Sequence, residues 1–245
     1  MQLDKDNTID ITGCESLEHL DLRHISNIDI SKNKNLKILE IWGNVNVDIE
    51  NNAPLLTDYW LYNSDLYTEI DLGDKPYLGE VRIYDSTFET LDISGCPNVE
   101  MFSLRTTGMK NLKVAKDTFF STIVEWSNGY ALDATKVHVY KGSYMDLWIN
   151  LGSPQYNICT EYYETQETHH KVTFVLKDGT EKIIEFPENS SIPNVFDDVF
   201  QNVSGQFEGW YLDSTCEQPY QLSTPVTADI KLYGKWNNNS AVQEI

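Results

Sequence analysis

The segments Ile28–Ile41 (IDISKNKNLKILEI) and Leu91–Leu104 (LDISGCPNVEMFSL) share one pattern: an apolar-Asp-apolar triplet, a turn, and an alternating apolar pair. The triplet returns along the first half of the chain at intervals of 19, 19, 23 and 21 residues. Its five copies are Ile9-Asp10-Ile11, Ile28-Asp29-Ile30, Val47-Asp48-Ile49, Ile70-Asp71-Leu72 and Leu91-Asp92-Ile93. A near-constant period of this length indicates a solenoid, because one coil cannot bury its apolar edge alone.

The apolar pair between one triplet and the next alternates strictly, which is the period of a β-strand. Each coil is therefore expected to carry two strand-like pieces, and stacked coils to form two parallel ladders around an apolar interior. The pairs are Leu20/Leu22, Leu39/Ile41, Tyr59/Leu61, Val81/Ile83, Phe102/Leu104 and Val124/Trp126. A third inward position is expected at Leu17, Leu36, Leu78 and Val99.

The quoted segments resemble the leucine-rich repeats of bacterial surface proteins, over about residues 1–126. Two departures occur in one coil: the coil Val47–Leu72 is longer than the others, and within it Tyr59-Trp60-Leu61 replaces the expected Leu-x-Leu. The resemblance implies a binding or display surface.

A closing element is expected where the repeats end. The segment Val137–Trp148 resembles the strand and short helix that cover the open end of such solenoids, with Ser143 as the helix cap. Leu147 and Trp148 are expected to pack onto the last coil. We therefore predict one solenoid domain over residues 1–165.

The pattern changes after a polar linker at 166–171. The apolar runs Val172–Leu176 and Lys182–Phe186 flank Lys-Asp-Gly-Thr, a hairpin signal because Asp-Gly supports the positive φ of tight turns. A short amphipathic helix is expected within Ser191–Phe200, with Val195, Phe196, Val199 and Phe200 on one stripe. Two more strands are expected near Phe207–Tyr211 and Ile230–Trp236.

The stretch Phe207–Asp213 (FEGWYLD), followed by Ser223–Trp236 (STPVTADIKLYGKW), resembles the Listeria–Bacteroides repeat. That family is a small β-grasp-like module of secreted and wall-associated bacterial proteins, so the resemblance implies such a module over 172–236. It also implies an extracellular, surface-attached location. The chain as a whole is expected to be β-rich α+β, with a flexible tail over 237–245.

The formal charge of −20, from 38 acidic and 18 basic side chains, disfavours phosphate backbones and anionic membranes as partners. No apolar run approaches the roughly 20 residues needed to cross a bilayer, so no direct membrane insertion is expected in this segment. An export signal is expected upstream of Met1, because Leu3 reads as part of a repeat.

Catalytic, cofactor and metal motifs are absent from the sequence, and a non-enzymatic protein is expected. The five histidines lack metal-ligand spacing, and neither a phosphate loop nor a Gly-x-Ser-x-Gly elbow occurs. Cys14 and Cys96 are expected to be buried thiols, and a pairing of Cys159 with Cys216 stays open. The repeated aspartates are expected to cap their own turns rather than hold cations.

The outward positions of the first ladder form the candidate site. One outward column reads Arg23, Trp42, Tyr62, Tyr84, Arg105, and its neighbour reads Asp21, Glu40, Trp60, Arg82, Ser103. Aromatic side chains with arginine are typical of binding hot spots. The expected ligand-binding residues are Trp42, Trp60, Tyr62, Tyr84, Arg82 and Arg105.

The expected function is protein–protein binding or adhesion at a host or neighbouring cell, with the C-terminal module as a spacer. Two alternatives stay open at this point: a glycan-binding module, because flat aromatic side chains also stack on sugar rings, and an accessory segment of a larger secreted enzyme.

Overall fold

The computed structural model describes residues 9–116, 118, 122–125, 136–152, 159–194 and 206–237. Contacts divide the chain into two units, one of residues 1–139 with 156–161 and the other of 140–155 with 162–245. The first unit is a β-solenoid of stacked parallel strands, and regular helix is nearly absent from the described chain.

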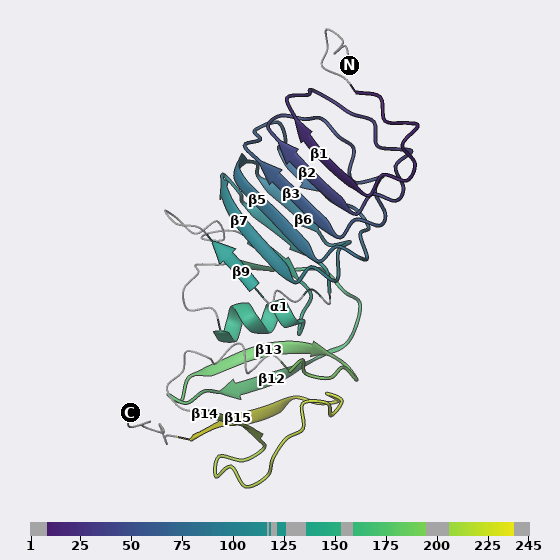
Figure 1. The fold of residues 1–245 in the computed structure, drawn as a ribbon. Helices are drawn as coiled ribbons and strands as arrows, with labels where there is room; N and C mark the ends of the chain where they lie inside the picture. Colours follow the sequence, from purple (N-terminus) through teal and green to yellow (C-terminus); the bar gives the residue numbers. More distant parts are fainter. Residues whose placement is uncertain are drawn as a thin grey trace, which may run out of the picture. The chain divides into compact units, whose positions relative to one another are not determined.

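The first sheet of the solenoid is parallel and follows the order β1-β2-β3-β5-β7-β9 (Figure 1). Its strands are β1 His19–Arg23, β2 Ile38–Trp42, β3 Asp58–Tyr62, β5 Glu80–Thr87, β7 Met101–Thr107 and β9 Thr122–Glu125. Pairing runs in register from coil to coil, so that Leu39 is opposite Tyr59 and Tyr59 is opposite Val81. These three side chains are fully buried, which confirms the predicted inward pair in the central coils.

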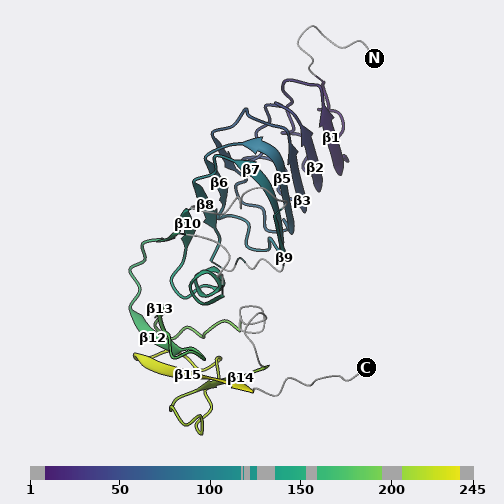
Figure 2. The ribbon, with the colours of Figure 1, turned by 90° about the vertical axis from the view of Figure 1, so that its left-hand side faces the viewer.

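The second sheet has the order β11-β10-β8-β6-β4. Its strands are β4 Glu69–Asp71, β6 Thr90–Ile93, β8 Asn111–Val114, β10 Lys136–Val139 and β11 Cys159–Tyr162. It is shorter than the first sheet, because among the described residues no ladder joins the earlier triplets, and an isolated bridge links Asn27 with Asn46 beside them. β4 is thus the edge strand of the second sheet, although further coils precede it in the solenoid. Figure 2 shows the second sheet beside the first.

Two sequence expectations in the solenoid are wrong. Val124 was expected to continue the inward pair, but it lies opposite the outward Ser103, while Ile123 lies opposite the inward Phe102; Trp126 lies outside the described residues. Cys14 is exposed, whereas Cys96 is buried as expected. Cys14 belongs to the first described coil, where even Leu17 is only partly buried.

The second unit contains a mixed four-stranded sheet of order β13-β12-β15-β14. Its strands are β12 His169–Val175, β13 Glu181–Pro187, β14 Gln206–Tyr211 and β15 Ile230–Asn237. β12 and β13 form the predicted antiparallel hairpin, in which Gly179 adopts a φ of +84°. The central strands β12 and β15 are parallel, and β14 runs antiparallel to β15. β12 begins at His169, within the stretch expected to be a linker.

The short helix α1 Tyr144–Leu147 and the π-helical turn η1 Trp148–Gly152 also belong to the second unit. Ser143 caps α1 as predicted, since its hydroxyl accepts from the Asp146 N–H at 3.3 Å. Leu147, however, is buried in a core with Val172, Phe174 and Ile184, and Trp148 packs against that core. Both residues therefore belong to the core of the second unit, because they pack on the apolar face of the hairpin.

Some expectations fall outside the described residues. They concern the apolar stripe of the predicted helix at 195–200 and the tail beyond Asn237. Cys216 is a free thiol, and the side chain of Cys159 is outside the description.

Candidate binding surface

The outward column of the first sheet is assembled by strand register. Trp42 on β2 lies opposite Tyr62 on β3, which lies opposite Tyr84 on β5. Arg23 and Arg105 pair with the two ends of this row. We call Arg23, Trp42, Tyr62, Tyr84 and Arg105 the aromatic column.

The rings of the aromatic column stack along the ladder. The Trp42 and Tyr62 centroids are 4.2 Å apart with planes 17° from parallel, close to the roughly 4.8 Å spacing of paired strands. Tyr62 and Tyr84 follow at 5.6 Å in a tilted arrangement. Arg23 lies 4.6 Å from the Trp42 ring centroid and Arg105 lies 5.7 Å from that of Tyr84. A cation–π contact is thus present at each end of the row.

The second column brings Trp60 beside the first. The Arg82 guanidinium lies 5.0 Å from the centroid of the Trp60 ring, and its Nη2 is 3.9 Å from the sulfur of Met101. The Trp60 indole N–H is buried and has no hydrogen-bond partner among the described residues. The half-buried Trp42 indole N–H, in contrast, donates to Glu40 at 2.6 Å.

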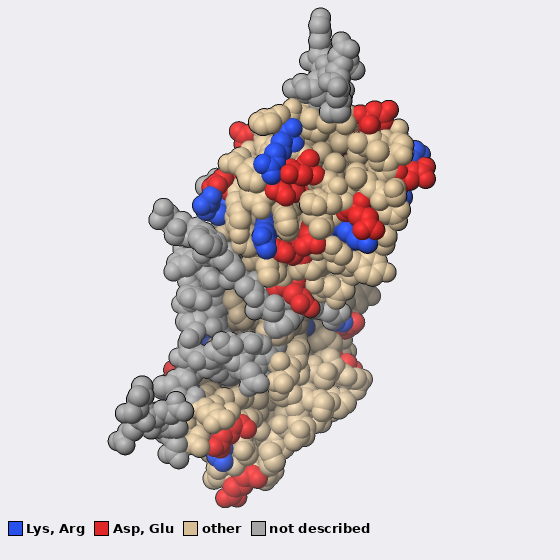
Figure 3. All heavy atoms as spheres, viewed as in Figure 1, with Lys and Arg blue, Asp and Glu red and all other residues tan. Residues whose placement is uncertain are grey.

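Each arginine of the surface is paired with a carboxylate. Arg23 bonds to Asp21 at 2.9 Å and lies 3.6 Å from Glu40. Arg82 pairs with Glu80, and Arg105 with Asp85. Burial raises the pKa of Glu80, and the neighbouring Arg82 opposes this shift. Figure 3 shows basic and acidic side chains side by side over β1 to β7, with uncharged surface between them.

This geometry decides what the surface offers to a ligand. The four aromatic side chains are half-buried, and Trp42 has Arg23 and Tyr62 against its two faces because β1 and β3 flank β2. The rings therefore present edges and polar tips to solvent. Such a surface can bury apolar edges and offer paired charges, which suits a protein surface better than a sugar ring that needs an open ring face.

All six predicted site residues lie on this one face. Sequence reasoning left Arg23 and Met101 out of the set. The position of Arg23 in the outward column could have indicated it from the sequence. Its contact with the Trp42 ring, however, depends on side-chain conformation. Met101, which is 37% exposed, precedes the inward Phe102 and lies opposite Glu80.

The aspartate triplets lie on the other side of each coil and cap turns, as predicted. The residues that donate a backbone N–H to Asp10, Asp29, Asp48, Asp71 and Asp92 are Thr12, Ser31, Asn51, Gly73 and Ser94, at 2.8 to 3.2 Å. These bonds lower the pKa of Asp10 and Asp29. Hydrogen bonding to Asp92 raises the pKa of Lys113 to about 12.

The described part of the chain holds neither a cluster of metal-ligating side chains nor a membrane-spanning helix. No three His, Cys, Asp or Glu side chains there gather around a point that could hold a metal ion. No helix there is long and apolar enough to span a membrane.

Comparisons of the chain with protein-family models, curated proteins and solved structures give no significant match.

Proposed function

We propose that this chain is a non-enzymatic, cell-surface or secreted bacterial protein that binds another protein through the outer face of its first sheet. The observation that carries the proposal is the row of contacting rings from Trp42 to Tyr84, with Trp60 and Arg82 beside it. Tryptophan, tyrosine and arginine dominate binding hot spots, and here they lie together on adjacent strands.

The contacts between the rings also lower the entropic cost of binding. Rings that already pack against one another lose little conformational freedom on binding. A partner protein can therefore bury them at low entropic cost.

The charge pattern favours a protein over a glycan. Paired arginines and carboxylates at the edges of the row match the polar rim of a protein interface. The ring faces needed for sugar stacking are covered by neighbouring rings and guanidinium groups, so a glycan is the weaker candidate.

The second unit is proposed to be a β-grasp-like spacer of the Listeria–Bacteroides kind. Its sheet order, with the first and last of its strands parallel at the centre and an antiparallel partner at each edge, supports this proposal. The same resemblance, with that of the coils to bacterial leucine-rich repeats, supports an extracellular or cell-surface location.

The test is the binding of labelled chain to intact bacterial and animal cells, before and after treatment of those cells with a protease or with glycosidases. Binding that is lost after protease and kept after glycosidase treatment supports the proposal. The reverse pattern assigns the surface to glycans, and absence of saturable binding to every cell contradicts a role in adhesion.

A further inference from the structure

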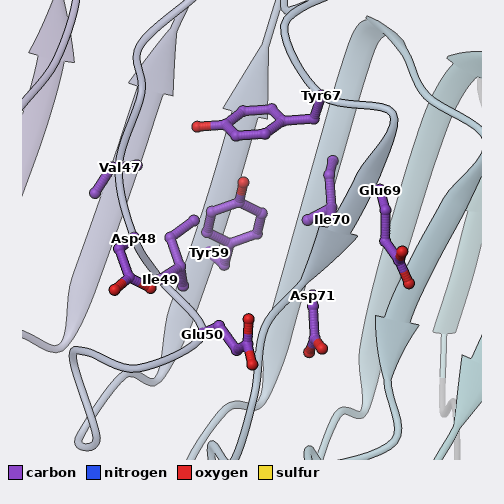
Figure 4. Close-up of a pocket in the computed structure, with 9 residues that line it drawn as sticks. All are labelled: Val47, Asp48, Ile49, Glu50, Tyr59, Tyr67, Glu69, Ile70 and Asp71. Carbon is purple, nitrogen blue, oxygen red and sulfur yellow. The ribbon is translucent and has the colours of Figure 1, made fainter.

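The long coil of the solenoid opens a pocket in the second ladder. The segment Val47–Glu50 occupies the coil next to β4, and both segments lie within the described residues. The two nevertheless form no β-ladder with each other. Between them is a pocket of about 370 Å³, within the range of small-ligand sites (Figure 4). Both departures from the repeat, the longer coil and Tyr59 in place of leucine, occur at this pocket.

Tyr59 supplies a buried polar group aimed at the pocket. Its side chain is fully buried, and its hydroxyl has no hydrogen-bond partner among the described residues. Figure 4 shows this hydroxyl pointing toward the ring of Tyr67, which crosses the gap and bonds to the Val45 carbonyl at 2.5 Å. Burial raises the pKa of Tyr59 well above its usual range, so the group stays a neutral donor and acceptor. A buried hydroxyl left unpaired is costly, and a ligand would remove that cost.

The walls of the pocket are acidic. Asp48 and Glu50 come from one wall and Glu69 and Asp71 from the other (Figure 4). Two ammonium groups lie near them: Lys113 pairs with Glu69 at 3.3 Å, and the buried Lys75 donates to the Glu50 carbonyl at 3.1 Å. Lys113 also bonds to Asp92 at 2.9 Å, so the four carboxylates of the pocket outnumber the ammonium groups that can neutralise them, in a chain of net charge −20.

The lining fits an organic cation better than a metal ion. Among the described residues no three acidic side chains converge on one point, as a metal ion would need. Two tyrosine rings and the aliphatic side chains of Ile49 and Ile70 instead suit a hydrocarbon body that carries an ammonium or guanidinium group. Carboxylates from both walls can then attract the positive charge of the bound cation, which is spread over its ammonium or guanidinium group.

We propose that this pocket binds an organic cation, an ammonium or guanidinium group on a short hydrocarbon chain, between the carboxylates of its two walls and the Tyr59 hydroxyl. The cation belongs either to a free amine or to a lysine or arginine side chain of a polypeptide. Because Tyr67 covers the Tyr59 hydroxyl, binding displaces the Tyr67 ring.

The experiment titrates the full chain, followed by NMR, with agmatine as the free cation and N-acetyl-arginine amide as the side-chain source. N-acetyl-citrulline amide is the neutral counterpart of the second probe. Saturable shifts of the Tyr67 ring with a cationic probe, and none with the citrulline compound, are expected. The better binder of the two cations identifies the source.

Three variants locate the binding. Tyr59→Phe and Asp71→Asn are each expected to weaken binding by about tenfold. The Asp71→Asn side chain keeps an acceptor oxygen for the Gly73 N–H, so the turn is retained. Asp178→Asn makes the same change at a turn of the second unit, where Asp178 accepts from the Thr180 N–H at 2.9 Å, and its affinity is expected to stay at the wild-type value.

Tyr59→Phe also carries an independent readout. Removing an unpaired buried hydroxyl is expected to leave the free protein at least as stable as the wild type. Three results would each overturn the proposal: no saturable binding of either cation, equal binding of the citrulline compound, or equal effects of Asp178→Asn and Asp71→Asn.

Discussion

Trp42 and Tyr62 stack face to face on adjacent strands, with ring centroids 4.2 Å apart and an interplanar angle of 17°. Their Cα atoms are direct partners in the parallel ladder. Since neighbouring coils are in register, the backbone itself sets the separation of the two rings. The stack is therefore a consequence of the repeat as well as a feature of the surface.

The stacked pair is expected to be energetically coupled. A double-mutant cycle with Trp42→Ala and Tyr62→Ala, measured by denaturant unfolding, should give a coupling of about 0.5–1.5 kcal/mol. The matched control joins Trp42→Ala with Arg105→Ala at the far end of the column, where the effects should add within about 0.5 kcal/mol. Additivity in the first cycle would mean that the contact contributes nothing beyond ordinary burial.

Close approach of turns sets the spacing of the coils near the pocket. Gly73 has a φ of +62°, and a Cβ added there would overlap the Glu50 carbonyl oxygen. Gly73→Ala should therefore lower the free energy of unfolding by about 2 kcal/mol or more. At Gly13 an added Cβ meets nothing within 4 Å, so Gly13→Ala should change it by no more than about 0.5 kcal/mol. Equal effects in thermal melts would contradict this account of the turns.

The stability of the solenoid should depend on pH through Asp92. Burial raises the pKa of Asp92, but bonds from Lys113 and Ser94 outweigh this and leave it lowered. A carboxylate with a lowered folded-state pKa stabilises the fold above about pH 4, and its contribution is lost as the pH falls through the folded-state value.

Asp92→Asn removes that contribution and should cost about 1 kcal/mol at pH 7. The melting temperatures of wild type and variant should converge as the pH falls below about 4. A constant difference across pH 3 to 7 would show that the loss is steric rather than electrostatic.

The in-register columns could be predicted from sequence because strand alternation and repeat spacing are local properties. Once Leu39 and Tyr59 were both assigned inward, Trp60 and Tyr62 had to face outward. The turn caps at Asp29 and Asp92 were predictable for the same reason, since each lies two residues from its donor.

Other features depend on how coils fit together and could not be predicted. The register of β9 differs from the expected one, so Val124 aligns with Ser103. The gap beside β4 depends on which segments fail to pair, and the position of Arg23 over Trp42 depends on side-chain conformation. Leu147 could be assigned to a core by its apolar character, but not to the core of the second unit.

The most direct test of the central claim is the dissociation constant for the cell surface that the wild-type chain binds, compared between three proteins. They are the wild type, the double variant Trp60→Ala/Tyr62→Ala, and the control Tyr77→Ala, which removes a 60% exposed aromatic side chain outside both columns. We predict that the double variant, still folded by circular dichroism, binds at least about tenfold more weakly, while the control stays within about twofold of wild type. Unchanged affinity in the double variant would contradict the assignment of this face as the binding surface.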